Sequence, residues 1–103
     1  MMEHYRAWLK KKPDDRLALY GLAFELKKRG AFDESLAAFE HLLELHPTSG
    51  AGWFQYGQLL EEEGEEEQAL EVWRRGLAAL EGVDTDDGRR SKAEITSAID
   101  ALE

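Results

Sequence analysis

Histidines and serines are the side chains of this sequence that could bind a metal or attack a substrate. They are His4, His41, His46, Ser35, Ser49, Ser91 and Ser97. His41 and His46 are five residues apart, which does not place them on one face of a helix, and no H-E-x-x-H pair occurs. No serine lies in a G-x-S-x-G turn, and no glycine-rich phosphate loop is present. We therefore expect no catalytic residue, no cofactor and no metal site, and a protein that is not an enzyme.

The acidic segment 61–67 is a candidate for a charged site. It holds six glutamates around Gly64. We interpret it as a solvated corner, because blocks of like charge usually face water. A site for a basic partner is the alternative. Metal binding is less favoured, since nothing in the sequence forces these carboxylates to converge.

A second acidic segment, 84–88, is spaced like the start of a calcium loop. It contains Asp84, Asp86, Asp87 and Gly88. An EF-hand would place its glycine where Arg89 stands and its bidentate glutamate where Ile95 stands. We therefore interpret this segment as a polar loop.

The net charge of −9 is unevenly distributed over the 103 residues. Residues 1–29 carry eight Lys or Arg and four Asp or Glu, whereas residues 30–103 carry five and eighteen. The acidic part should repel nucleic-acid phosphates, so we expect no nucleic-acid binding. The imbalance either serves solubility or pairs the basic end of one protein with an acidic end of another.

The composition is that of a globular protein, with 43% hydrophobic and 10% aromatic residues. A single domain over residues 1–103 is long enough to bury a core. The absence of cysteine excludes disulfides and thiolate metal sites. The N-terminus lacks the apolar stretch of a signal peptide, and no apolar run approaches the roughly 20 residues of a membrane span. We expect a cytoplasmic protein that does not bind membranes.

The elements that must position any site repeat along the chain. A shift of 34 residues aligns Leu19 with Trp53, Leu22 with Tyr56, Ala23 with Gly57, Leu26 with Leu60, Gly30 with Gly64, Phe39 with Trp73 and Leu43 with Leu77. Apolar residues step by three and four within 16–29 and within 53–60, which marks one face of a helix. Gly30 and Gly64 are typical of helix ends that need a left-handed residue. No segment alternates long enough to predict a strand.

This period, with a small residue early and a proline late, resembles the tetratricopeptide repeat, in the form of a small bacterial-type domain that stands alone. Residues 16–49 and 50–83 are the two full copies. The resemblance implies an all-α, right-handed solenoid of helical hairpins. It also implies a half-repeat helix at residues 1–13 and a capping helix at residues 89–102.

Six helices are expected, at roughly 2–12, 16–29, 34–46, 50–63, 66–80 and 90–102. Ser91 with Glu94 is a capping-box pattern that would mark the start of the last helix. We expect this helix to bury Ile95, Ala98, Ile99 and Leu102, and Gly82 to Gly88 to form a loop before it.

The resemblance further implies a concave face that the first helix of each hairpin lines. The predicted peptide-binding groove consists of Tyr20, Phe24, Lys27, Phe54, Gln55 and Gln58. Some family members grip a C-terminal carboxylate with Lys and Asn, but Tyr20, Phe24 and Gln55 stand at the matching positions here. We therefore expect a scaffold that binds an apolar or mixed peptide, or a helix, of another protein. The alternative for these aromatic residues is simple burial, in part against the last helix.

A second functional hypothesis is a self-assembling structural unit. The first helix lacks a partner helix in the repeat pattern, which would leave Met2, Tyr5 or Trp8 exposed as an interface. The basic start and acidic remainder of the chain would suit head-to-tail contacts in a homo-oligomer.

Overall fold

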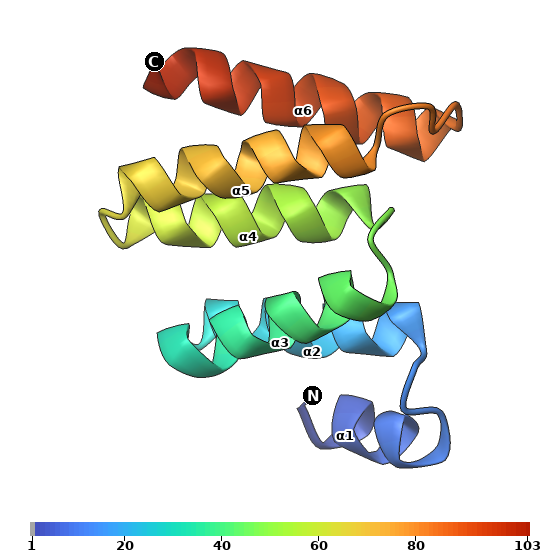
Figure 1. Ribbon diagram of the computed structural model, residues 1–103. Helices are drawn as coiled ribbons and strands as arrows, with labels where there is room; N and C mark the ends of the chain where they lie inside the picture. The colour runs from blue at the N-terminus through green and yellow to red at the C-terminus, as the bar shows by residue number, and fades with distance from the viewer. Residues whose placement is uncertain (1) are drawn as a thin grey trace. The chain divides into compact units, whose positions relative to one another are not determined.

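The computed structural model describes residues 2–103, which form six helices joined by short turns (Figure 1). The helices are α1 (Met2–Lys11), α2 (Arg16–Lys28), α3 (Phe32–Leu45), α4 (Gly50–Glu62), α5 (Glu66–Ala79) and α6 (Asp86–Leu102). No strand occurs in residues 2–103, and the all-α class predicted from the sequence is confirmed. Residue 1 of the predicted half-repeat lies outside the described part of the chain.

The helices group into two compact units, Met1–His46 and Pro47–Glu103. We call them the N-terminal unit and the C-terminal unit and describe each by itself. The predicted single domain over residues 1–103 stays a prediction, as do the repeat boundaries.

The core of the N-terminal unit lies between α2 and α3. It buries Ala18, Leu19, Ala23, Leu26, Phe39, Leu42 and Leu43. A buried hydroxyl crosses this interface, because Ser35 Oγ on α3 donates a hydrogen bond of 2.8 Å to the carbonyl of Ala23 on α2. The small side chains of Ala23 and Ser35 allow the two helices to approach closely.

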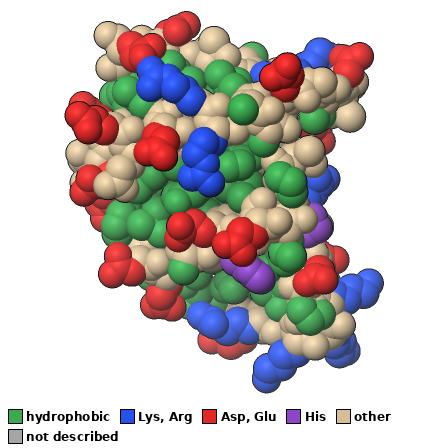
Figure 2. All heavy atoms as spheres, viewed as in Figure 1, with side chains coloured by type: hydrophobic (Ala, Val, Ile, Leu, Met, Phe, Trp, Pro, Cys, Tyr) green, Lys and Arg blue, Asp and Glu red, His purple; other side chains and the backbone are tan. Residues whose placement is uncertain are grey.

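Helix α1 packs against α2 through an aromatic ring on a glycine. A Cβ atom added to Gly21 would lie 2.3 Å from Tyr5 Cε1, so the ring uses the space that a side chain would need. Met2, Tyr5 and Trp8 are half-buried, and α1 therefore has a packing partner within its own unit. Its basic side chains are exposed, and Figure 2 shows Lys and Arg side chains gathered over this helix.

Two corners have the same geometry, 34 residues apart. At the first, Gly30 has φ +78°, and the amides of Gly30 and Ala31 donate to the carbonyls of Lys27 and Leu26. At the second, Gly64 has φ +82°, and the amides of Gly64 and Glu65 donate to the carbonyls of Glu61 and Leu60. These bonds form the Schellman motif, which satisfies the last carbonyls of a helix and needs a left-handed residue.

In the C-terminal unit, α4 and α5 pack by a reciprocal exchange of tryptophan and glycine. A Cβ atom on Gly57 would lie 2.0 Å from Trp73 Nε1, and a Cβ atom on Gly76 would lie 2.8 Å from Trp53 Cβ. Each indole therefore lies over a glycine of the other helix. Both nitrogens are satisfied, because Trp73 Nε1 donates to the carbonyl of Phe54 at 3.2 Å and Trp53 Nε1 to the carbonyl of Pro47 at 2.8 Å.

Five helices begin and end within two residues of the predicted positions, but the start of α6 was predicted wrongly. The helix begins at Asp86, and its N-cap is Thr85, whose Oγ1 accepts a hydrogen bond of 3.0 Å from the amide of Gly88. Asp86 and Asp87 then place negative charge in the first turn, where the helix dipole favours it. The expected loop therefore ends at Thr85.

Ser91, the predicted cap, instead lies buried inside α6, where a Cβ atom on Gly50 would be 2.3 Å from Ser91 Cβ. It acts as a small residue at a helix contact. Of the side chains that α6 was expected to bury, Ile95 and Ile99 are buried, whereas Ala98 and Leu102 are half-buried.

None of the helices within residues 2–103 combines the length and the apolar character that crossing a membrane would require.

Candidate functional site

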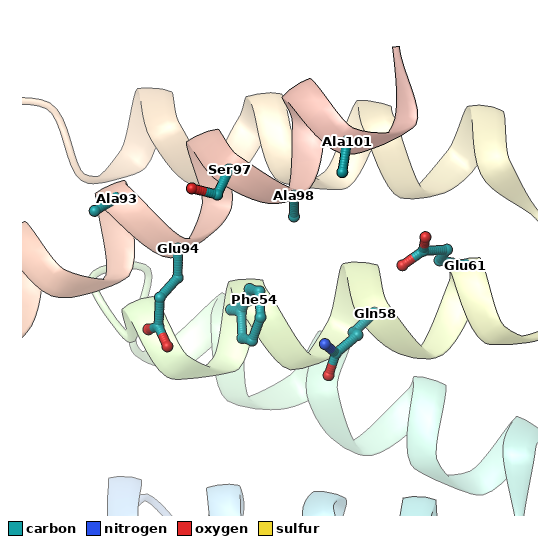
Figure 3. A pocket seen from close by; sticks show the side chains of 8 residues that line it. All are labelled: Phe54, Gln58, Glu61, Ala93, Glu94, Ser97, Ala98 and Ala101. Atoms are coloured by element: carbon teal, nitrogen blue, oxygen red, sulfur yellow. The ribbon is translucent and has the colours of Figure 1, made fainter.

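A groove lies between α4 and α6 in the C-terminal unit. Its volume is about 520 Å³. The lining residues are Phe54, Gln58 and Glu61 from α4 and Ala93, Glu94, Ser97, Ala98 and Ala101 from α6. Figure 3 shows Ala98 and Ala101 directed from α6 toward α4, with Phe54 and Gln58 on the facing helix. The groove is thus a slot between two helices, with one aromatic wall and one wall of small side chains.

The α4 wall is positioned by the packing of the tryptophans. Trp53 is buried against α5, so the next residue, Phe54, is turned away from that interface and is half-buried. The hydrogen bond from Trp73 Nε1 holds the backbone at Phe54 by its carbonyl. Gln58 and Glu61 follow at helical spacing and continue the same face of α4.

The α6 wall is positioned by contacts on the opposite side of that helix. Ile95 and Ile99 are buried, and Ser91 lies against Gly50. Lys92 Nζ donates a hydrogen bond of 2.8 Å to the carbonyl of Val83, which holds the start of α6 to the preceding turn. The face that carries Ala93, Ser97 and Ala101 is therefore left exposed beside α4.

The structure places two of the six predicted groove residues, Phe54 and Gln58, in this groove. Gln55 is half-buried on α4 and is not among the lining residues. Sequence reasoning missed the whole α6 wall and Glu61. The signal was present in the helical spacing of small residues at 93, 97 and 101, on a face without Ile95 and Ile99.

The other predicted groove residues lie in the N-terminal unit and form their own arrangement. Tyr20 and Phe24 are stacked, with ring centroids 5.9 Å apart and planes at 12°, and Tyr20 meets Phe39 edge-on at 6.4 Å. Lys28 Nζ lies 5.5 Å from the centre of the Phe24 ring. Lys27 is half-buried on the same helix. Tyr20 and Phe24 are both half-buried, whereas Phe39 belongs to the core.

The glutamates of the acidic segment 61–67 differ in their solvent exposure. Residues 62–67 are exposed around the left-handed Gly64, which agrees with the interpretation as a solvated corner. Glu61 differs, because it is half-buried and lines the groove. The interpretation was therefore wrong for this one residue.

The acidic segment before α6 is neutralised locally. Arg89 pairs with Asp84 and Asp86, and Arg90 Nη1 lies 3.6 Å from Asp87 Oδ1. Over residues 2–103, no three His, Asp or Glu side chains come together in a way that could hold a metal ion. The charged groups of the groove are two carboxylates, Glu61 and Glu94.

The fold by itself defines a class of protein: hairpins of two antiparallel helices with a 34-residue period and small-on-large packing between them. The model of the tetratricopeptide repeat family matches residues 38–71. Over this segment the chain resembles tetratricopeptide-repeat proteins. The sequence matches none of the curated proteins.

Several solved structures have a similar fold. The solution structure of a tetratricopeptide repeat domain protein from Salinibacter ruber has a TM-score of 0.77 and 25% identity, over 88% of this chain and 89% of that one. A crystal structure of a tetratricopeptide repeat domain protein from Salinibacter ruber has a TM-score of 0.73 and 24% identity, over 85% of this chain and 94% of that one. The type III secretion translocator chaperone SycD of Yersinia enterocolitica has a TM-score of 0.83 and 13% identity, over 98% and 68%. The latter two likenesses concern the fold.

Proposed function

We propose that this chain is a non-catalytic scaffold that binds a peptide or a helix of another protein in the groove between α4 and α6. Tetratricopeptide repeats are in general modules through which proteins bind other proteins. The structural neighbour SycD is described as a type III secretion translocator chaperone. The observation that carries the proposal is the groove itself, which has an aromatic wall and a wall of small residues.

The dimensions of the groove suit part of a polypeptide. Its volume of about 520 Å³ accommodates a few side chains. Ala93, Ala98 and Ala101 leave room for a ligand to approach the backbone of α6, and Phe54 supplies an apolar surface. Ser97 offers a hydroxyl to a peptide group. Helix-in-groove and extended-peptide binding both use such walls.

The predicted contacts outside this groove remain part of the proposal. They are Tyr20, Phe24 and Lys27 on α2, and Gln55 on α4. A ligand that used the aromatic stack of α2 would lose affinity when Tyr20 is replaced by alanine. Binding that is unchanged in Tyr20→Ala would limit the binding surface to the C-terminal unit.

Selection of peptides from a random library displayed on phage, on the immobilised full chain, tests the proposal. Ala98→Trp fills the groove, and Ala78→Trp adds the same bulk at an exposed position of α5 outside it. The selected peptides should bind the wild type and Ala78→Trp and should lose at least tenfold in affinity for Ala98→Trp. Equal affinity for both variants would contradict the assignment of the groove. Circular dichroism checks that both variants are folded.

Self-association through the N-terminal unit is the second candidate function, favoured by the distribution of charge. Residues 1–29 carry eight basic and four acidic residues, whereas residues 47–103 carry five and fourteen, so the start of the chain is basic and the C-terminal unit is acidic. Leu17 is 67% exposed and Leu45 40% exposed. Light scattering after size exclusion at low and high salt tests this candidate. A monomer at every concentration and salt level would exclude it.

A further inference from the structure

We infer that the groove between α4 and α6 selects a cationic segment, with an apolar side chain at its centre and Lys or Arg on either side. The inference rests on the proposed function and names the chemistry of the partner. Its first support is the placement of the two carboxylates. Glu94 lies at the Phe54 end of the groove and Glu61 at the Ala101 end, so they bracket a middle that combines Phe54 and Ala98 with the polar side chains of Gln58 and Ser97 (Figure 3).

Both carboxylates are available to a ligand. Neither Glu61 nor Glu94 forms an ion pair or a side-chain hydrogen bond with another residue of the described chain. No Lys or Arg is among the lining residues. Two carboxylates beside an apolar wall favour a ligand of opposite charge and disfavour an acidic one.

The cations of the C-terminal unit are all engaged elsewhere. Arg89 and Arg90 pair with the aspartates around the start of α6, and Arg74 pairs with Glu103. Arg75 lies over the Trp53 ring, 5.3 Å from its centre, and Lys92 holds the carbonyl of Val83. Each of the five basic side chains thus has a partner outside the groove, and the groove keeps its negative charge.

The helix ends add to this negative charge. Helices α4 and α6 run in the same direction (Figure 1), so both C-termini lie at the Glu61 end of the groove. The C-terminus of a helix carries about half a negative charge. Neither helix has a basic residue in its last turn to offset it. The opposing N-terminus of α5 is already matched by Glu66 and Glu67.

The length of the groove along α4 defines the ligand further. Phe54 and Glu61 are seven residues apart on α4, which corresponds to about 10 Å along the helix. Lys or Arg side chains seven positions apart on a bound helix span the same distance. In an extended peptide, Lys or Arg side chains three positions apart span about the same distance. The favoured partner is a segment of another protein with such a pair of cations around one or two apolar residues, and not an acidic tail. A second copy of this chain is the competing occupant, which the test below distinguishes.

The test uses fluorescence anisotropy with three labelled peptides that share one apolar centre and are flanked by Lys, Gln or Glu. The double variant Glu61→Lys/Glu94→Lys reverses the charge of the groove. Its matched control, Glu71→Lys/Asp100→Lys, makes the same change in net charge at exposed positions outside the lining.

For the wild type and the control, we expect the Lys-flanked peptide to bind about tenfold more tightly than the Glu-flanked one at low salt, a gap that narrows as salt rises. In Glu61→Lys/Glu94→Lys the order should invert. The oligomeric state of the protein without peptide is measured by light scattering after size exclusion. We expect no dimer of the wild type that becomes monomeric in Glu61→Lys/Glu94→Lys. Such a dimer would assign the groove to a second copy and would overturn the inference.

The remaining outcomes separate this inference from the proposed function. Equal binding of all three peptides, abolished by Ala98→Trp, would leave the peptide groove standing and overturn the cation selectivity. Binding that ignores Ala98→Trp would overturn both. If no peptide of this set binds, but library peptides without cations bind in a groove-dependent way, only the cation selectivity is overturned. No binding in either experiment overturns both.

Discussion

The indole of Trp73 occupies the space that a side chain on Gly57 would need. The nitrogen of the ring lies 2.0 Å from the position of an added Cβ atom, and Trp73 is fully buried. The same nitrogen donates a hydrogen bond to the carbonyl of Phe54, one turn earlier on α4. The close approach of α4 to α5 therefore depends on the absence of a side chain at 57, and it fixes the backbone that carries the aromatic wall of the groove.

Replacement of Gly57 by alanine should destabilise the C-terminal unit. Alanine gains about 1 kcal/mol of helix propensity over glycine, but its Cβ forces a buried ring to move, and overpacking typically costs about 1–3 kcal/mol. We expect a net loss of up to about 2 kcal/mol in the free energy of unfolding, measured by urea denaturation. Trp73→Phe should partly relieve the clash. A double-mutant cycle in which the two changes are simply additive would contradict this account.

The repeat signal explains why much of the fold could be predicted. Pairs such as Gly30 and Gly64 have backbone roles that only a left-handed residue fulfils cheaply, so their 34-residue spacing marks the corners from the residue types alone. The small residue at 57 opposite a large one at 73 is also visible in the period. Backbone conformation and side-chain size are requirements of single positions, so they can be predicted from the residue type at each position.

The small residues at 93, 97 and 101 mark one face of the last helix, but the pairing of this face with α4 could not be predicted, because residues 84–103 do not follow the 34-residue period. Ser91 fits a capping box by pattern alone, but the requirement that decides its role is the approach of Gly50, which is 41 residues away. For the same reason the sequence did not show that Ala98 faces α4. The repeat pattern does not predict which residues far apart in the sequence come into contact.

The docking of α1 should depend on Gly21. A Cβ atom there would lie 2.3 Å from the Tyr5 ring, so Gly21→Ala should push α1 away from α2 while the α2–α3 core remains. Hydrogen exchange should show a loss of amide protection in residues 2–11 of about tenfold or more. Tyr5→Leu in the same chain should restore part of the protection. Unchanged exchange in α1 would show that the helix accommodates the methyl group.

The buried hydroxyl of Ser35 should contribute measurably to the N-terminal unit. Ser35→Ala removes the 2.8 Å hydrogen bond to the carbonyl of Ala23, and the loss of such a bond costs about 1 kcal/mol. Ser97→Ala is the matched control, because this serine is exposed on α6. Thermal unfolding followed by circular dichroism should show a lower midpoint for the first variant and no change for the second. Equal midpoints would mean that the hydrogen bond contributes no net stability.

The start of α6 is tested by comparing Thr85 with Ser91. Thr85→Ala removes the side-chain oxygen that accepts from the amide of Gly88, and the loss of an N-cap costs about 1 kcal/mol. Ser91→Ala keeps the Cβ that faces Gly50 and removes only the hydroxyl, so its effect should stay within about 0.5 kcal/mol.

The two substitutions therefore distinguish the two positions for the start of the helix, with urea denaturation as the measurement. If Ser91 were the cap, the order of the two losses would be reversed. Because α6 supplies five of the eight residues that line the groove, Thr85→Ala should also weaken peptide binding in that groove, whereas Ser91→Ala should not.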